Sequence, residues 1–134
     1  MFERIKFERF TAFEHLEITL SPGINLFLGE NGTGKTHILK AAYAACDITK
    51  SKGGVAEKIN TVFHPSGKQI GRLVKRSGNS NKGSLEVVRR LEDGREARLR
   101  LSLSGPTAAP SEQITSPTPS RMGGYPVLKA TCKI

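Results

Sequence analysis

The feature that most constrains this chain is a glycine-rich stretch at residues 29–36, which reads GENGTGKT. It fits the phosphate-loop pattern G-x-x-x-x-G-K-[ST] at every fixed position. In a chain of this length, chance agreement at those positions has odds of about one per cent or less, given ordinary residue usage. A plain glycine-rich turn before a helix is therefore a poor explanation, and the pattern predicts that the chain binds a nucleoside triphosphate.

Each residue type in this phosphate loop has a physical reason to be there. Glycines let successive backbone N–H groups turn inward around a phosphate, and the helix that follows points its positive end at the same anion. Lys35 is predicted to reach the β- and γ-phosphates as the catalytic cation, and the Thr36 hydroxyl to ligate Mg²⁺. The predicted nucleotide-binding residues are Gly29, Glu30, Asn31, Gly32, Thr33, Gly34, Lys35, Thr36 and His37.

The segments around the loop indicate its setting. Residues 24–28 carry apolar side chains on both faces, and we expect a central strand that is buried on both sides. Residues 37–48 have small and apolar residues at helical spacing, so we expect a helix that lies close to a sheet. Residues 4–8 and 16–21 alternate between apolar and polar, as half-buried strands do.

Three later segments have the composition of strands: residues 70–76, 85–91 and 97–103. A two-residue turn between the last two would spoil their apolar face. A three-residue loop with Gly94 in the left-handed conformation pairs Val87 with Leu99 instead, and we prefer it. The outer face is then expected to carry Glu86, Arg90, Arg98 and Arg100.

The positive charge is concentrated in the middle of the chain. The net charge is +9, and residues 51–104 hold twelve Lys/Arg against five Asp/Glu, a surplus of +7. Such a stretch can attract nucleic acid or an acidic partner. No aromatic residue interleaves with the charges, so base stacking is not indicated. We favour a solvated sheet face with cations on its outer positions, and DNA remains open as a partner.

Residues 5–43 read IKFERFTAFEHLEITLSPGINLFLGENGTGKTHILKAAY. This run resembles the N-terminal lobe of the RecF-like, SMC-like and ABC-type ATPases. More narrowly, it is similar to the bacterial AAA family ATPases related to RecF and to overcoming-lysogenization-defect nucleases. The matching features are the opening I-x-F-x-x-F, the Pro-Gly-Ile-Asn run at residues 22–25 and the Asn-Gly pair inside the loop. The resemblance is strong over residues 3–48 and fades afterwards.

The resemblance implies an α/β fold class, namely the N-terminal lobe of a P-loop NTPase with an antiparallel β-subdomain. It implies ATP and Mg²⁺ as cofactors, with ATP held between two heads, so that a homodimer or a partner ATPase head is expected. It also implies work in DNA repair, defence or chromosome handling.

Two other functions stay open. One is a nucleotide-binding module without hydrolysis, because no carboxylate is evidently placed to orient water. The other is an ABC transporter ATPase subunit, although an adenine-stacking aromatic strand and a proper signature loop are not evident. No N-K-x-D guanine-reading motif appears, so ATP is favoured over GTP.

The chain divides by composition near residue 105. Residues 1–104 are predicted to form an incomplete ATPase lobe. Residues 105–134 hold five of the seven prolines, seven Ser/Thr and no apolar periodicity, so we expect a disordered or non-native tail. A complete ATPase of this class would next supply a signature loop, an Asp-Glu strand end and a switch histidine. Since the sequence has none of them, we expect a truncated head, and hydrolysis by this chain stays open.

Several other residues carry weaker signals. Gln69 could contact a metal, and Arg9 and Thr11 could contact nucleotide as in the similar ATPases, but ordinary solvation is the default for all three. The three histidines have no metal-ligand spacing. The N-terminus is charged at every second or third residue, unlike a signal peptide, and no apolar run approaches membrane-spanning length. We therefore expect a cytoplasmic protein without a membrane partner.

Overall fold

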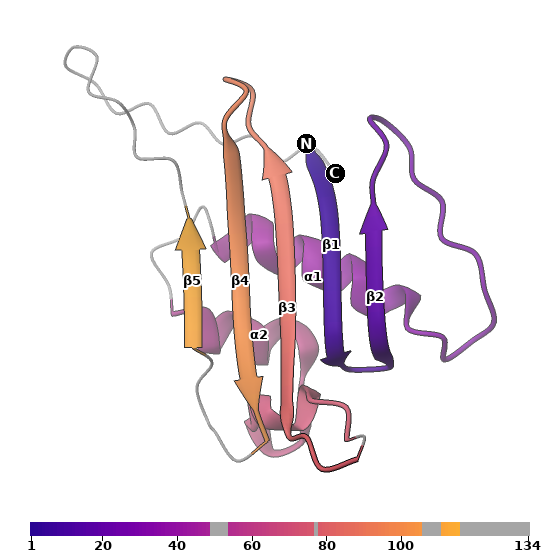
Figure 1. Ribbon diagram of the computed structural model, residues 1–134, viewed down its shortest axis with the longest axis vertical. Helices are drawn as coiled ribbons and strands as arrows, with labels where there is room; N and C mark the ends of the chain where they lie inside the picture. Colours follow the sequence, from indigo (N-terminus) through magenta and orange to yellow (C-terminus); the bar gives the residue numbers. More distant parts are fainter. Residues whose placement is uncertain (49–53, 77, 106–110, 116–134) are drawn as a thin grey trace.

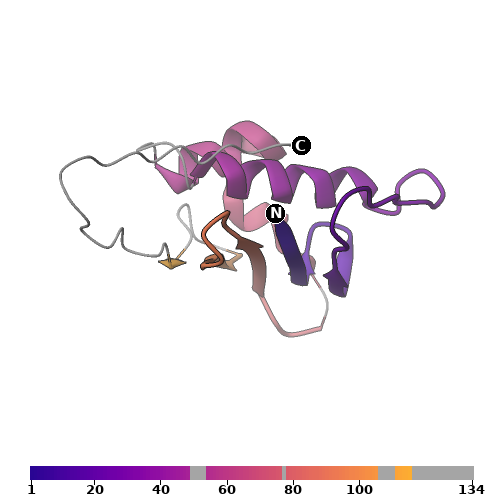
Figure 2. The same cartoon turned by 90° about the horizontal axis from the view of Figure 1, so that it is seen from above.

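A computed structural model describes residues 1–48, 54–76, 78–105 and 111–115. Its strands form one antiparallel sheet in the order β2-β1-β3-β4-β5. They are β1 (Phe2–Phe10), β2 (Phe13–Thr19), β3 (Lys82–Arg90), β4 (Glu96–Ser104) and β5 (Ser111–Thr115). Helices α1 (Lys35–Ile48) and α2 (Val55–Phe63) both lie on one face of the sheet (Figures 1 and 2). Two short 3-10 turns, η1 (Ser66–Lys68) and η2 (Ile70–Leu73), follow at one end.

The core lies between this sheet and the helices. Alternate residues of the three inner strands face the helices, and each is at most 1% exposed: Ile5, Phe7, Leu85, Val87, Leu99 and Leu101. Helix α1 is lined with alanines on its buried side, so its backbone can approach the sheet closely. Phe10 adds an aromatic contact, since its ring centroid lies 5.2 Å from that of Phe7 and 5.3 Å from that of Phe63 on α2. The predicted antiparallel β-subdomain and the predicted helix after the loop are both confirmed.

The β3–β4 hairpin has the predicted register. Val87 pairs with Leu99, and Gly94 adopts a left-handed φ of 81° in the connection. The N–H of Leu91 donates to the carbonyl of Arg95 at 2.8 Å, which closes a three-residue loop. Turn chemistry and the alternation of apolar residues therefore suffice to set this pairing.

The segment that leads into the phosphate loop differs from its prediction. Residues 24–28 form no strand, and Ile24, Leu26 and Leu28 are 95%, 76% and 82% exposed. The prediction of a central strand buried on both sides is therefore wrong for this chain. Such a strand needs neighbours on both edges, and none of the described strands pairs with these residues. The parallel part of the predicted α/β fold is accordingly not seen among the described residues.

Two further segments depart from the expectations. Residues 70–76, predicted as a strand, form η2 and then a single bridge between Val74 and Phe10. Gly71 packs against the carbonyls of Ser104 and Gly105 too closely for a Cβ, which suits a tight turn. The expected tail without regular structure contains β5, which pairs with β4. Residues 106–110 and 116–134 lie outside the described part of the chain.

No helix within the described ranges is long and apolar enough to span a membrane.

Candidate nucleotide-binding site

The phosphate loop is open to solvent and ends at the start of a long helix. Residues 29–33 are exposed, and α1 begins at Lys35 and runs for 14 residues. Within the described part of the chain, the backbone N–H groups of Gly34, Lys35 and Thr36 donate to no protein acceptor. Open amides at the positive end of a helix favour an anion. These amides lie where the sequence predicts an anion site, and anion binding there stays a prediction.

Lys35 is held over this loop by the loop itself. Its ammonium donates to the carbonyl of Gly29 at 2.7 Å and to that of Glu30, and lies 3.4 Å from the Thr33 hydroxyl. The Thr33 hydroxyl in turn donates to the Glu30 carbonyl at 2.9 Å. An ammonium has three donors, and two are taken up by carbonyls at short range. The third has only a distant acceptor in Thr33, so it remains available for a phosphate oxygen.

Two features require glycine at position 34: a positive φ angle and the lack of space for a Cβ atom. Its φ is +95°, and a Cβ at this position would lie 2.5 Å from Cζ of Phe13 and 3.2 Å from Cβ of Ala12. Gly32 also has a positive φ, of +83°, but a Cβ there would meet nothing within 4 Å. The turn between β1 and β2 thus packs directly on the loop at Gly34. Sequence reasoning missed this contact, because it joins two turns that no local pattern connects.

Thr36 and His37 begin the helix on different sides. Thr36 is exposed, while the half-buried ring of His37 stacks on Phe63 at 6.3 Å and 27°. Burial, followed by the positive charge of Lys40, lowers the pKa of His37 below its ordinary value. The backbone N–H of His37 donates to the Gly34 carbonyl at 2.9 Å. His37 therefore belongs to the loop through its backbone and to the core through its ring.

The weaker candidates have other contacts. The side-chain oxygen of Gln69 accepts a hydrogen bond from Nε of Arg72 at 3.1 Å, as an ordinary surface glutamine would. The N–H of Thr11 donates to the Leu73 carbonyl at 2.7 Å, and its buried hydroxyl has no partner among the described residues. Neither contact involves the phosphate loop.

Lys75, one of the basic residues of the segment 51–104, contacts the β1–β2 turn that packs on the loop, a placement that the sequence does not predict. Its ammonium donates to the carbonyl of Ala12 at 3.3 Å and lies 3.8 Å from the Glu14 carboxylate. Ala12 also packs on Gly34 of the phosphate loop, so Ala12 is the residue that lies between Lys75 and the loop. Only the basic composition of residues 51–104 hinted at such a residue.

The donor set suits a magnesium-bound polyphosphate better than a metal alone. Among the described residues, no group of three or more His, Cys, Asp or Glu side chains could hold a metal ion. Mg²⁺ at phosphate sites is commonly bound by one or two protein groups together with the phosphates. The loop offers such a set in the Lys35 ammonium, the open amides and the Thr36 hydroxyl.

The glycine-rich loop at residues 29–34 leads into a helix that packs on a sheet, an arrangement that P-loop proteins share. A family model described as "AAA domain" matches residues 4–122, and the chain belongs to that family.

The chain is also similar to several proteins named "DNA replication and repair protein RecF". The protein from Streptococcus thermophilus is 32% identical over 101 residues, which are 69% of this chain and 27% of that protein. The one from Listeria welshimeri is 37% identical over 75 residues (55% and 20%), and the one from Cytophaga hutchinsonii is 47% identical over 49 residues (37% and 13%). The matches thus span about a quarter or less of these relatives. Together with the family match, they identify the sequence as the N-terminal part of a RecF/SMC-like P-loop ATPase.

Proposed function

We propose that this chain is the ATP-binding part of a P-loop ATPase that acts in DNA repair, defence or chromosome handling. The observation that carries the proposal is the arrangement of Lys35. Two loop carbonyls hold its ammonium, and three backbone amides at the N-terminus of α1 donate to no acceptor among the described residues. This arrangement supports the proposal, because a fixed ammonium and the positive end of a helix both favour an anionic triphosphate tail.

Each predicted residue has a role in this proposal. Lys35 binds the β- and γ-phosphates, and the Thr36 hydroxyl ligates Mg²⁺. Gly32 and Gly34 give the loop its shape through positive φ angles. The remaining residues of the site act through their backbones: Gly29, Glu30, Asn31, Thr33 and His37. Magnesium, bound with ATP, would neutralise charge on the phosphates.

The DNA-related role rests on the similar proteins, whose printed name concerns DNA replication and repair. A second head, either another copy or a partner ATPase, would complete the nucleotide site from the opposite side. The protein is proposed to work in the cytoplasm.

The second candidate is nucleotide binding without turnover. In the described part of the chain, no hydrogen bond or ion pair joins a carboxylate side chain to the phosphate loop. Asp47, on the same helix, pairs with Lys58 instead. Because hydrolysis requires a group that orients the attacking water, we expect weak or no ATP turnover. Steady turnover by the purified chain that Lys35→Ala abolishes would reject this second candidate.

The binding proposal is tested by titrating the chain with Mg-ATP in a calorimeter. Lys35→Ala removes a charge-assisted contact to phosphate and should weaken binding by roughly 10- to 100-fold, with far-UV circular dichroism unchanged. Thr36→Ala should weaken Mg-ATP binding as well. Lys40→Ala is the matched control, since it removes the same charge from the same helix and should leave the affinity within about twofold. Unchanged affinity in Lys35→Ala would contradict the site.

A further inference from the structure

The turn between β1 and β2 lies directly behind the phosphate loop, and its backbone is strained. Arg9 and Thr11 have positive φ angles of 42° and 53°, which are uncommon for residues with a side chain. Ala12 in this turn and Phe13 after it leave no room for a Cβ at Gly34. A strained turn keeps its conformation only when its surroundings hold it. The packing behind Gly34 therefore depends on the residues that contact the turn.

Two backbone hydrogen bonds join this turn to the segment that follows η2. The N–H of Thr11 donates to the carbonyl of Leu73 at 2.7 Å, and the N–H of Lys75 donates to the carbonyl of Arg9 at 2.9 Å. They flank the single β-bridge between this segment and the end of β1. Leu73 and Val74 are buried in the core, so the segment is a fixed support for the turn.

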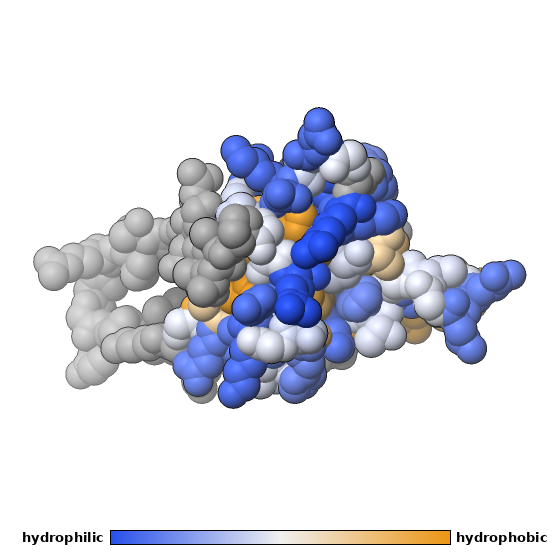
Figure 3. All heavy atoms as spheres, turned by 90° about the horizontal axis from the view of Figure 1, so that it is seen from below, coloured by the Kyte–Doolittle hydropathy of each residue, from blue (hydrophilic) through white to orange (hydrophobic). Residues whose placement is uncertain are grey.

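The side chain of Lys75 makes a further contact with the turn. Its ammonium donates to the carbonyl of Ala12 at 3.3 Å and lies 3.8 Å from the carboxylate of Glu14. Figure 3 views the molecule from this end of the sheet and shows mostly hydrophilic side chains there. The side chains of Lys75 and Glu14 are 40% and 52% exposed, and such an ion pair contributes little. The contact that acts on the turn is therefore the bond to the Ala12 carbonyl.

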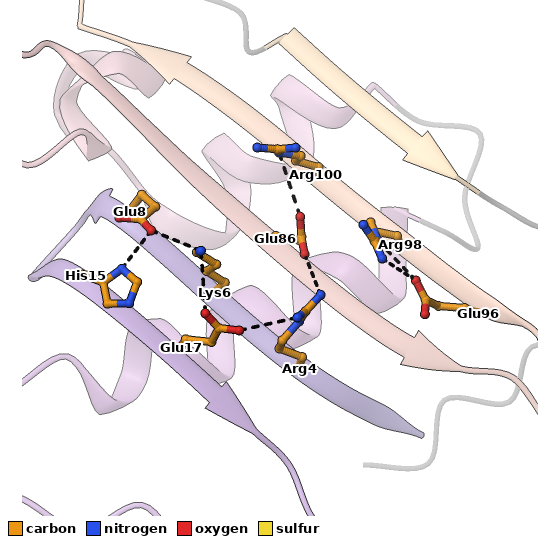
Figure 4. A network of polar contacts seen from close by, with 9 residues as sticks. All are labelled: Arg4, Lys6, Glu8, His15, Glu17, Glu86, Glu96, Arg98 and Arg100. Atoms are coloured by element: carbon orange, nitrogen blue, oxygen red, sulfur yellow. Dashed lines mark hydrogen bonds and ion pairs between the residues drawn. The ribbon is translucent and has the colours of Figure 1, made fainter.

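Other cations of the sheet make contacts of a different kind. Figure 4 shows the outer face, where four basic residues pair with carboxylates: Arg4, Lys6, Arg98 and Arg100. Lys6, for example, lies 3.4 Å from Glu8 and 3.6 Å from Glu17. Within the described ranges, none of the four bonds to a carbonyl of the β1–β2 turn. Lys6 is accordingly a matched comparison for Lys75.

We propose that Lys75 is a positioning residue for the nucleotide site, because it holds the β1–β2 turn in the conformation that packs on Gly34. It acts through the turn and does not touch the phosphates. A bound nucleotide that fixes the phosphate loop stabilises the turn in return, since coupling between two sites is reciprocal. The inference rests on the nucleotide binding proposed above, and it adds a residue that lies outside the loop.

The experiment uses four variants of the full chain. Lys75→Met removes the ammonium and keeps the N–H, whereas Lys75→Pro removes both bonds to the turn. Val74 has φ −74° and ψ 121°, a conformation that a following proline accepts. Lys75→Arg keeps a cation at this position, and Lys6→Met is the control that loses the same charge. Calorimetric titration with Mg-ATP and with Mg-ADP gives the affinities, and circular dichroism checks the fold.

The affinity for nucleotide should fall with the number of bonds that are lost. Lys75→Met should weaken the binding of Mg-ATP and Mg-ADP alike by about three- to fivefold, and Lys75→Pro by about tenfold or more. Lys75→Arg and Lys6→Met should each change it by less than about twofold. A cation that touched the γ-phosphate would instead favour ATP over ADP, and its effect would shrink with added salt.

A second measurement does not need nucleotide. Amide hydrogen exchange, followed by NMR, reports on Thr11 in the turn and on His37, whose N–H bonds to the carbonyl of Gly34 at 2.9 Å. Lys75→Pro should speed exchange about tenfold at Thr11 and about threefold or more at His37, with the β3–β4 hairpin unchanged. Lys6→Met should alter neither amide. If the unaltered chain bound no nucleotide, the proposed function would fail while this measurement still tested the positioning.

Three results would overturn the inference. The first is a nucleotide affinity in Lys75→Met that equals that of Lys6→Met, and this test stands even if Lys75→Pro does not fold. The second is a loss confined to ATP that disappears with salt, which would make Lys75 a phosphate-binding cation. The third is unchanged exchange at His37 in Lys75→Pro although exchange at Thr11 rises, which would mean that the turn does not position the loop.

Discussion

The sheet-and-helix core and the segment that leads into the phosphate loop are both apolar in sequence, but they differ in burial. Phe7 and Leu85 in the core are fully buried, whereas Ile24 and Leu28 before the loop are 95% and 82% exposed. Hydrophobicity does not explain the contrast. The inner strands β1, β3 and β4 each have a hydrogen-bonded neighbour on both edges, and residues 24–28 have none among the described strands.

The strands of the antiparallel sheet supply one another's hydrogen-bonding partners, whereas residues 24–28 have no strand partner among the described residues. Residues 24–28 are held by a local turn and by one side chain. The side chain of Asn25 accepts from the Ser21 N–H and donates to the Ser21 carbonyl, each at 2.9 Å, and the half-buried Phe27 packs against the core. A strand with apolar residues on both faces gains stability only from neighbours on both faces. Substitutions in the two regions should therefore differ greatly in cost.

A cavity in the core should cost the most stability. Phe7 is 0% exposed, and its ring lies 5.2 Å from that of Phe10 and 5.4 Å from that of Phe13. Phe7→Ala should lower the free energy of unfolding by about 3–5 kcal/mol, because it leaves a cavity among these rings. Leu28→Ala should change it by less than about 0.5 kcal/mol, as exposed sites do. Urea unfolding of both variants measures the difference. Similar losses would mean that the segment before the loop is packed in solution.

The next prediction concerns the contact between the β1–β2 turn and the phosphate loop at Gly34. Gly34→Ala forces a Cβ into Phe13 at a φ of +95°, whereas Gly32→Ala meets a φ of +83° in open space. Both should suffer the left-handed penalty of about 1–2 kcal/mol, and Gly34→Ala should lose roughly 1–3 kcal/mol more through the clash. Thermal unfolding measures the stability of each variant, and titration with Mg-ATP shows whether the phosphate loop still binds nucleotide. Equal destabilisation by the two substitutions would contradict the packing of the β1–β2 turn on the loop.

Features set by residues close together in the sequence are predicted well, whereas burial that depends on distant strands is not. The pairing of Val87 with Leu99 follows from alternation and a glycine in the turn, which act within one hairpin. The loop and its helix follow from the residue types at residues 29–36, which act locally as well. For residues 24–28 the apolar pattern predicts a buried strand, and this is wrong because burial of a strand on both sides depends on neighbours that the described structure does not provide.

The rest of the candidate site is nonlocal, and this is why sequence reasoning missed it. The contact of Phe13 with Gly34 depends on a turn in which Arg9 and Thr11 have positive φ angles of 42° and 53°. Positive φ angles are uncommon for arginine and threonine, so the sequence does not predict this conformation. The basic residues are visible in the sequence, but only the fold shows that Arg4 and Arg100 pair across strands with Glu86, whereas Arg72 and Arg76 have no carboxylate partner among the described residues.

A smaller effect is expected from His37, whose ring packs on Phe63 while its backbone N–H bonds to Gly34 of the phosphate loop. Burial, and then the charge of Lys40, lowers its pKa from the ordinary value of 6.5. The unfolded chain therefore binds more protons than the folded one in the interval just below that value, and the free energy of unfolding should decrease as the pH falls through it. Above this interval both states carry a neutral imidazole, so this residue adds no pH dependence there.

Urea unfolding at a series of pH values around this interval measures the effect. His37→Gln should remove this part of the pH dependence, while Lys40→Gln should reduce it by taking away the second cause of the shift. Since His37 packs on Phe63, His37→Gln will also lower stability uniformly, so the slope with pH and not the stability itself is the informative quantity. An unchanged slope in His37→Gln would mean that the ring is solvated, and that α1 begins outside the core rather than at its edge.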